Sequence, residues 1–209
     1  MWIMEKNKKE MIYEATLSLI EDNYQLAQIK VGDIAKKANI GKGTIYEYFD
    51  SKEEVISETI AYMIKGWVQG LEDILDENES FEQSYKKILQ NIFPMMKKKH
   101  QIFMGFMMLS RSSKTSVGAL HKLMEKNNEE IQQKIIHLYE KIVDKSLEEG
   151  IINEKPEVFD WYFAVNSSIM CVLIYEDQFA NQRVFSGKVR YDQEQIIEKA
   201  YRIFVKLLG

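Results

Sequence analysis

Apolar residues recur every three or four positions along most of the chain, which is the spacing of one buried face of an α-helix. The clearest stripe runs from Ile56 to Ile74, and it follows the residues Ser51–Glu54, which form a capping box at a helix start. Similar patterns predict helices over about residues 11–23, 31–38, 42–48, 52–76, 80–94, 101–111, 117–149, 156–179 and 196–208. The chain is therefore expected to be all-α, with nine helices arranged as a small three-helix head and a larger helical body.

No part of the sequence is typical of a membrane or secreted protein. The longest run without a charged residue covers positions 161–175, which is short of the ~20 apolar residues that a spanning helix needs. The first residues, Met1–Lys6, reach charged positions at once and lack the apolar stretch of a secretory signal. We therefore expect a soluble, cytoplasmic protein.

The two short helices predicted near the N-terminus have the form of a helix-turn-helix. Ile34 in the first and Ile45 and Phe49 in the second fall on inward-facing positions, and Asn39 and Gly41 supply the turn. The outward positions of the second helix are Lys42, Thr44, Tyr46, Glu47 and Tyr48. An amine, a hydroxyl and two phenols suit contacts with phosphates and base edges, although a helical hairpin without a DNA role would show the same pattern.

The segment from Val31 to Glu54 closely resembles the DNA-binding domain of TetR-family transcriptional regulators. The resemblance rests on the Asp33-Ile34-Ala35 start, the KGTIYEYF run from Lys42 to Phe49, and the SKEE ending at Glu54. It implies a DNA-binding domain over residues 1–50, with its motif at about 30–49. It also implies an effector-binding and dimerisation domain over residues 51–209.

The resemblance also implies which side chains meet the DNA. They are Lys42, Gly43, Thr44 and Tyr46 at the bases or nearby backbone, Tyr48 and Lys52 at phosphates, and Lys30 and Gly32 at the start of the second helix. To these we add Glu47, whose carboxylate can accept a hydrogen bond from cytosine. Lys30 and Gly41 stand where the family often has a capping serine or threonine, so both helix starts are expected to bind phosphate more weakly.

The net charge of −4 would by itself argue against a nucleic-acid partner. The charge is unevenly placed, however, because residues 30–52 carry five lysines against three acids, a local charge of +2, and Lys6, Lys8 and Lys9 add a basic cluster. No arginine precedes Arg111, so the bidentate contact of arginine with guanine is missing from the head. We therefore expect salt-sensitive binding by two heads together, to an operator read partly through shape and A/T content.

Residues 92–124 hold six of the eleven methionines of the chain, together with several phenylalanines. Methionine adapts to irregular apolar partners, so this composition fits either an ordinary core or a pocket for an apolar ligand. The TetR resemblance implies an effector enclosed in this part of the body, which favours a small apolar or amphipathic ligand such as a lipophilic drug or an acyl chain. The candidate lining residues are Phe103, Phe106, Met107, Met124, Tyr139 and Trp161.

The predicted helix over 156–179 is apolar on nearly every side, so both of its sides need to be covered. We expect a second copy of the chain to cover one side, with the last helix contributing, as the resemblance to TetR-family dimers implies. The candidate interface residues are Phe163, Ser167, Met170, Ile174, Ile197, Tyr201, Phe204 and Leu208.

Residues suited to catalysis are few. His100, His121 and His137 have no metal-ligand spacing, and no glycine-rich phosphate loop occurs. Cys171, the single cysteine, lies within an apolar run and is expected to be a buried, inert thiol. We therefore expect no enzymatic activity, no metal and no cofactor.

These patterns together predict a homodimeric, ligand-responsive transcriptional regulator. We expect a repressor that a small apolar or amphipathic effector releases from a near-palindromic operator. Two alternatives remain open: an activator with the same DNA-binding head, and a helical protein that binds lipophilic ligands without binding an operator.

Overall fold

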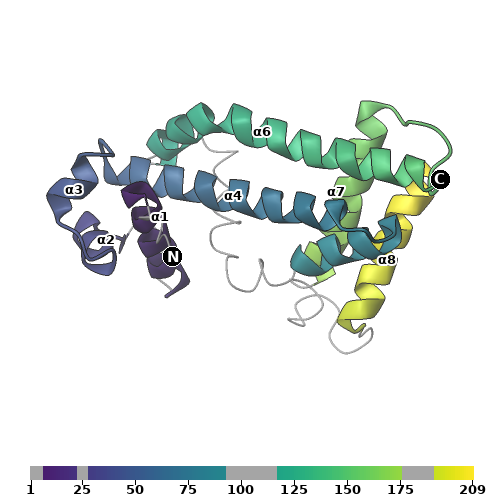
Figure 1. Ribbon diagram of the computed structural model, residues 1–209, viewed down its shortest axis with the longest axis horizontal. Coiled ribbons are helices and arrows are strands. Elements are labelled where there is room, and N and C mark those ends of the chain that lie inside the picture. Colours follow the sequence, from purple (N-terminus) through teal and green to yellow (C-terminus); the bar gives the residue numbers. More distant parts are fainter. Residues whose placement is uncertain (1–6, 23–27, 93–116, 176–190) are drawn as a thin grey trace. The chain divides into compact units, whose positions relative to one another are not determined.

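The computed structural model describes residues 7–22, 28–92, 117–175 and 191–209, with the backbone alone over 117–128. These residues form eight helices and no strand, which confirms the all-α prediction (Figure 1). The helices are α1 (Lys8–Glu21), α2 (Val31–Lys37), α3 (Lys42–Tyr46), α4 (Lys52–Asp76), a helix over residues 81–92, α6 (Val117–Glu148), α7 (Val158–Ile174) and α8 (Gln193–Leu208). The ninth predicted helix, over 101–111, and the predicted stop at Asn23 lie outside the described residues.

The described chain folds into two compact units. The first contains α1, α2, α3, α4 as far as Gly66, and α6 as far as Gln132. The second contains the rest of α4 and α6, the helix over 81–92, α7 and α8.

The first unit is built around the side chains that the helix periodicity places inward. Ile12 of α1, Ile34 of α2, Ile45 of α3 and Ile60 of α4 have no exposed surface, and they belong to one apolar core. Phe49 closes this core just beyond α3, with 2% of its surface exposed. The inward positions predicted for the head are therefore confirmed.

The second unit has an aromatic core shared by the helix over 81–92 and α8. The ring of Tyr85 lies 5.3 Å from that of Phe81 and 4.8 Å from that of Phe204, and all three side chains are buried. The hydroxyl of Tyr85 forms a hydrogen bond with that of Ser168 on α7, so the one polar atom of this ring is satisfied. The core thus joins three helices within the unit.

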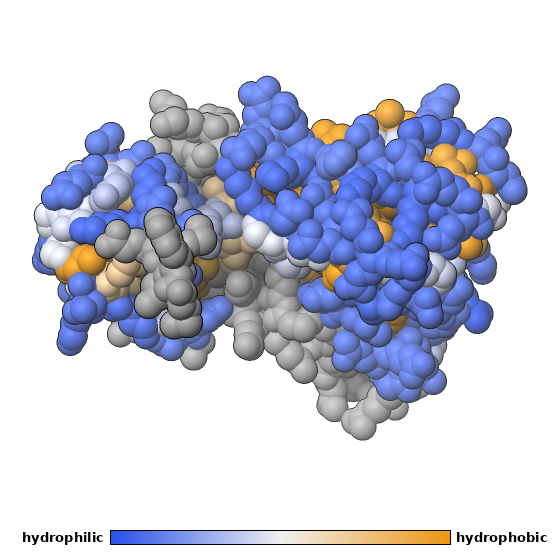
Figure 2. All heavy atoms as spheres, in the orientation of Figure 1, coloured by the Kyte–Doolittle hydropathy of each residue, from blue (hydrophilic) through white to orange (hydrophobic). Residues whose placement is uncertain are grey.

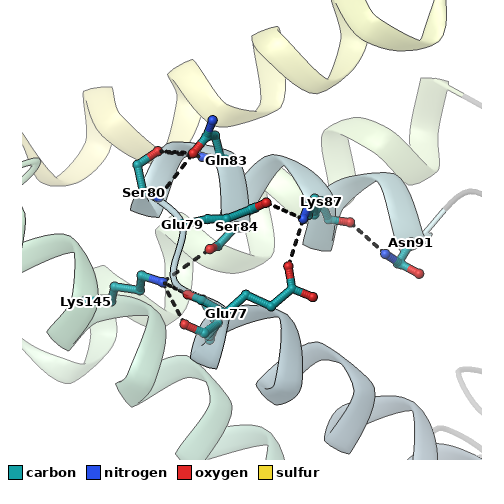
Figure 3. A network of polar contacts seen from close by, with 9 residues as sticks. Glu77, Glu79, Ser80, Gln83, Ser84, Lys87, Asn91 and Lys145 are labelled. Atoms are coloured by element: carbon teal, nitrogen blue, oxygen red, sulfur yellow. Dashed lines mark hydrogen bonds and ion pairs between the residues drawn. The ribbon is translucent and has the colours of Figure 1, made fainter.

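Charged side chains near the end of α6 hold the corner between α4 and the next helix (Figure 3). The ammonium of Lys145 donates to the carbonyl of Leu75, in the last turn of α4, at 2.7 Å and to the hydroxyl of Ser84 at 3.2 Å. One turn further along, the carboxylate of Glu149 accepts the backbone N–H of Phe81 through both oxygens, at 2.8 and 2.7 Å. A cation therefore meets a helix C-terminus and an anion meets a helix N-terminus, the arrangement that the helix dipole favours.

The surface of the described residues is mixed. On the face drawn in Figure 2 most of these residues are hydrophilic, and hydrophobic residues reach the surface in separate patches. Six of the exposed large hydrophobic side chains belong to α7: Val158, Phe159, Tyr162, Phe163, Met170 and Ile174. Among the described helices, none combines the length and apolar character that crossing a bilayer requires.

Candidate nucleic-acid interface

The turn between α2 and α3 is built by the C-terminus of α2. Asn39 has a φ of 54°, in the left-handed region that asparagine tolerates better than most residues. The N–H of Ile40 donates to the carbonyl of Ala35 at 3.0 Å, and the N–H of Asn39 donates to that of Lys36 at 3.3 Å. This pair of bonds is a Schellman motif, which ends α2 and turns the chain into α3.

The side chains predicted to face DNA lie on the outer side of this motif. Lys42, Gly43, Glu47 and Tyr48 are exposed, and Tyr46 exposes 55% of its surface. Thr44 is half-buried, as are Gly32 and Lys52, whereas Lys30 is exposed. The helix itself is shorter than the predicted 42–48, since α3 ends at Tyr46 and Tyr48 follows it in a turn.

One surface groove brings together five of the nine predicted DNA-binding residues, namely Lys30, Gly32, Lys42, Tyr46 and Lys52. We call it the lysine groove; its other lining residues are Gln28, Ile29, Val31 and Asp33. Asp33 is the only acid in this lining, and its carboxylate accepts the backbone N–H of Lys30 at 3.3 Å. The ammonium of Lys52 also lies 4.0 Å from the carboxylate of Glu53, which is outside the lining. The three lysines still outnumber these two acids, and a positive charge suits a phosphate.

The starts of the three helices around the groove differ in their caps. Lys30 and Gly41 are the N-cap residues that precede α2 and α3, and neither makes a side-chain capping bond. At the start of α4 the Ser51 hydroxyl accepts the N–H of Glu54 at 3.1 Å, as the capping sequence predicts. The Glu54 carboxylate reaches one residue further than predicted, because it accepts the N–H of Asp50 at 2.6 Å.

The sequence gives no sign of a polar cluster that joins α1 to α4 in the first unit. The Tyr13 hydroxyl donates to the Glu58 carboxylate at 2.6 Å, and the Lys9 ammonium donates to the same carboxylate at 3.2 Å. Burial of the phenol and the neighbouring carboxylate both raise the pKa of Tyr13. Lys9 also lies 5.0 Å from the centre of the Phe49 ring, so this lysine of the predicted basic cluster makes contacts inside the head.

The structure describes two of the six predicted effector residues. Tyr139 and Trp161 are buried at 7% and 4% exposure, and their rings meet edge to face at 6.0 Å. The Tyr139 hydroxyl donates to the side-chain carbonyl of Asn166 at 3.3 Å, and burial raises the pKa of this phenol. The other four, Phe103, Phe106, Met107 and Met124, lie outside the residues whose side chains are described.

The predicted dimer residues divide into two groups. On α7, Phe163, Met170 and Ile174 expose 41–52% of their surface, and Ser167 is half-buried. Leu208 on α8 is also half-buried.

Ile197, Tyr201 and Phe204 are only 3%, 8% and 0% exposed within the single chain, and their place in an interface stays a prediction. Phe204 and Tyr201 pack in the aromatic core of the second unit, against Phe81 and Tyr85 respectively, so burial within the chain already accounts for these two apolar positions.

No three His, Cys, Asp or Glu side chains come together as a metal site would require within the part of the chain that the structure describes. Cys171 is half-buried, and burial raises the pKa of its thiol. A raised pKa keeps a thiol protonated and poorly nucleophilic.

Comparison with known proteins settles the family. Residues 12–59, which include α2, α3 and the start of α4, match the family described as "Bacterial regulatory proteins, tetR family". The N-terminal part of the chain is a TetR-family domain. This match assigns residues 12–59 to the helix-turn-helix DNA-binding domain of transcriptional regulators.

The relatives with curated descriptions match between 40% and 70% of this chain. An uncharacterized HTH-type transcriptional regulator of Bacillus subtilis, YhgD, is 31% identical over 47% of this chain and 51% of its own length. A second regulator, from Haemophilus influenzae, is 34% identical over 40% of this chain and 44% of its own, so the chain spans about half the length of these two relatives. The fatty acid metabolism regulator protein of B. subtilis is 26% identical over 70% of each chain.

Solved structures with the same fold cover nearly the whole chain. FadR from Bacillus halodurans, a fatty acid degradation regulator, superposes with a TM-score of 0.64 at 17% identity over 96% of both chains. FadR from B. subtilis in complex with stearoyl-CoA superposes with a TM-score of 0.60 at 18% identity, over 96% of this chain and 99% of that one. At such identities the comparison establishes the fold, a helix-turn-helix head with a helical body.

Proposed function

We propose that this protein is a homodimeric TetR-family repressor that leaves a near-palindromic operator when an acyl-CoA or a similar amphipathic molecule binds. The observation that carries the proposal is the lysine groove, which lies beside the outward face of α3. We assign DNA binding to residues 1–50, and effector binding and dimerisation to residues 51–209.

DNA binding would use α3 as the recognition helix. Its exposed face carries Lys42 and Tyr46, and exposed Glu47 follows directly, while Ile45 anchors the helix in the core with no exposed surface. A helix held in this way can enter a major groove without losing its support. Two such heads in one dimer would read half-sites about 34–36 Å apart, one turn of DNA.

The effector proposal rests on the relatives and on the composition of the body. A B. subtilis FadR structure contains stearoyl-CoA and a Thermus thermophilus FadR structure contains lauroyl-CoA, and both share this fold. The chain itself supplies methionines and phenylalanines over residues 92–124, together with the buried ring pair of Tyr139 and Trp161. An acyl chain needs a pocket lined by such apolar side chains, whereas a CoA group needs polar and charged partners at the mouth of that pocket.

The dimer proposal rests on α7. Phe159 and Phe163 stack at 6.1 Å while exposing 73% and 52% of their surfaces, and Met170 and Ile174 continue the same side of the helix. Exposed apolar side chains at this spacing indicate a surface that a partner covers. A second copy would supply the same stripe around a two-fold axis, and Leu208 of α8 is the further predicted interface residue that is not fully buried.

The test uses the full chain and fluorescent duplexes from the DNA upstream of its gene. We expect salt-sensitive binding to one duplex, and release by stearoyl-CoA but not by CoA without an acyl chain. Tyr46→Ala should weaken binding at least tenfold, while the control Tyr62→Ala changes an exposed tyrosine of α4 and should leave it nearly unchanged.

Three outcomes would contradict parts of this proposal. Acyl-CoA binding without any salt-sensitive DNA binding would favour the helical ligand-binding protein. Lower transcription of the target after deletion of the gene would make the protein an activator. DNA release by polar ligands alone would rule out the acyl effector.

A further inference from the structure

Two glycines, Gly66 and Gly70, lie at exposed positions in the middle of α4, four residues apart. A Cβ added to either glycine would meet no described side chain or neighbouring segment within 4 Å. Neither glycine has a positive φ, so the backbone does not require glycine there. A glycine inside a helix makes the helix less stable than an alanine does, because glycine loses more conformational freedom. The pair therefore weakens α4 at positions where the described packing leaves room for larger residues.

The glycines lie where α4 passes from the first compact unit to the second. The boundary falls between Gly66 and Trp67, within one uninterrupted helix (Figure 1). The last buried residue of α4 before the boundary is Ala61, and the first one after it is Val68. Residues 62–67, which lie between these two, include none that is buried. Tertiary packing therefore supports both ends of α4 better than its middle.

Each end of α4 is also held to α6 by an ion pair within its own unit. In the first unit, the ammonium of Lys65 lies 2.5 Å from the carboxylate of Glu130. In the second unit, the ammonium of Lys141 lies 2.7 Å from the carboxylate of Asp76. These contacts hold the parts of α4 on either side of the two glycines.

The other described helix that crosses the boundary is α6, which does so after Gln132. Residues 132–137 of α6 include none that is buried, but this stretch contains no glycine. At the crossing α6 is therefore sparsely packed and keeps a backbone of ordinary helix-forming residues. Of the two helices, α4 is the one whose backbone is weakened at the boundary.

We propose that α4 opens and bends at Gly66–Gly70, and that this bend is the conformational step through which the effector changes operator binding. Glycine is one of the few residues at which a helix kinks. The straight helix would belong to the operator-binding state and the bent helix to the effector-bound state. An effector that binds the bent state more tightly shifts the population toward it and so releases the operator. The regulatory part of this inference rests on the proposed function and goes beyond it by naming the residues at which the change takes place.

The first measurement is hydrogen–deuterium exchange of the full chain without DNA or ligand, which reports local opening of a helix. In the unaltered chain, the amides of residues 67–74 should exchange at least about tenfold faster than those of residues 57–64 in the same helix. Gly66→Ala and Gly70→Ala should each slow exchange over 67–74 by about fivefold, and the double variant should slow it further. Each substitution should also raise the Tm by about 2–4 °C.

Gln69 supplies the matched controls, because it is an exposed residue of α4 between the two glycines. Gln69→Ala exchanges one good helix former for another and should change the exchange rates by less than about twofold. Gln69→Gly adds a third glycine and should speed exchange over residues 67–74 by about fivefold. Circular dichroism melts check that each variant is folded and give its Tm.

The second measurement is the release of the fluorescent upstream duplex by stearoyl-CoA. Alanine at both glycine positions stabilises the straight helix, so the double variant should need about tenfold more stearoyl-CoA for half-release. Its Kd for the duplex without stearoyl-CoA should stay within about threefold of that of the unaltered chain, because the straight state already predominates there. Gln69→Gly should lower the concentration needed for half-release, and Gln69→Ala should leave it unchanged.

The inference is overturned if residues 67–74 exchange no faster than residues 57–64, or if the double variant slows exchange without changing the half-release concentration. A double variant that sediments as a monomer, where the unaltered chain is a dimer, would also overturn it, because the glycines would then provide space for a second copy. Absence of DNA binding or of release by stearoyl-CoA in the unaltered chain is a different result. It would overturn the proposed function and the regulatory part of this inference, while the exchange rates still decide whether α4 opens at the glycines.

Discussion

The phenol of Tyr13 on α1 donates a hydrogen bond of 2.6 Å to the carboxylate of Glu58 on α4, 45 residues further along the chain. Lys9 donates to the same carboxylate at 3.2 Å, so one acid on α4 holds two positions of α1. Tyr13 is buried and its ring also meets Phe49 edge to face at 5.9 Å. This cluster therefore links α1 to α4 by polar contacts, in addition to the apolar core that the two helices share.

Glu58→Gln and Tyr13→Phe should each lower the free energy of unfolding by about 1–3 kcal/mol, because the first removes the charge of the acceptor and the second removes the donor, while both keep the packing volume. Glu129→Gln, at an exposed position of α6, should change it by less than about 0.5 kcal/mol. Urea unfolding followed by circular dichroism measures both values. Equal effects of Glu58→Gln and Glu129→Gln would show that the cluster does not stabilise the fold.

Lys145→Met should destabilise the second unit by about 1–3 kcal/mol, because it leaves the Leu75 carbonyl at the end of α4 without its ammonium partner. Lys141→Met is the matched control one turn earlier on α6, where the ammonium forms a surface ion pair of 2.7 Å with Asp76. Surface pairs contribute about 0–1 kcal/mol, so the control should cost less. Thermal unfolding compares the two variants directly, and a larger loss for Lys141→Met would contradict the assignment.

Stability should fall as the pH rises above about 10, where free tyrosine ionises. Burial raises the pKa of Tyr85 above its ordinary value, and the pKa of Tyr139 and Tyr13 is raised in the same way. Below the ordinary pKa of tyrosine, these phenols keep their protons in both the folded and the unfolded chain, so they add no pH dependence to the unfolding free energy. Above it the unfolded chain loses protons that the folded chain retains, so the unfolding free energy decreases by up to about 1.4 kcal/mol per pH unit for each phenol.

Tyr85→Phe should therefore make the alkaline loss of stability less steep, although it also removes the hydrogen bond to Ser168 and lowers stability at neutral pH. Urea unfolding at several values between pH 9 and pH 11 gives the slope for each protein. An identical slope in the variant would mean that Tyr85 ionises as easily in the fold as in the unfolded chain.

Phe163→Arg should convert the proposed dimer into a monomer, because it places a charge in the exposed apolar stripe of α7. Ile136→Arg, at a 45% exposed position of α6, is the control and should leave the dimer intact. Sedimentation velocity at micromolar concentration gives the mass of each protein. A dimer that persists in Phe163→Arg and dissociates in Ile136→Arg would place the interface on α6.

Most of the helices could be predicted from the sequence because their signals are local. The glycine at position 150 ends α6 with a φ of 70°, and Asn39 ends α2 with a φ of 54°, both by the same pair of short-range hydrogen bonds. The inward positions of the head, such as Ile34 and Ile45, follow from a period of three to four residues. Such signals depend only on neighbours along the chain.

Contacts between distant residues could not be predicted in this way. Periodicity shows that one face of α8 is apolar, but not that Ile197, Tyr201 and Phe204 are already covered within their own chain. Likewise nothing local places Lys42 against Gly32, ten positions earlier, or Tyr13 against Glu58.

The amino-acid sequence alone determines the all-α class, the helix-turn-helix and the outward face of α3, because each depends on spacing within a few turns. Only the tertiary structure decides which polar side chains meet and which apolar faces are already covered. The physical reason is that these outcomes depend on how separate helices pack, and packing brings together residues whose distance along the chain carries no information about their distance in space.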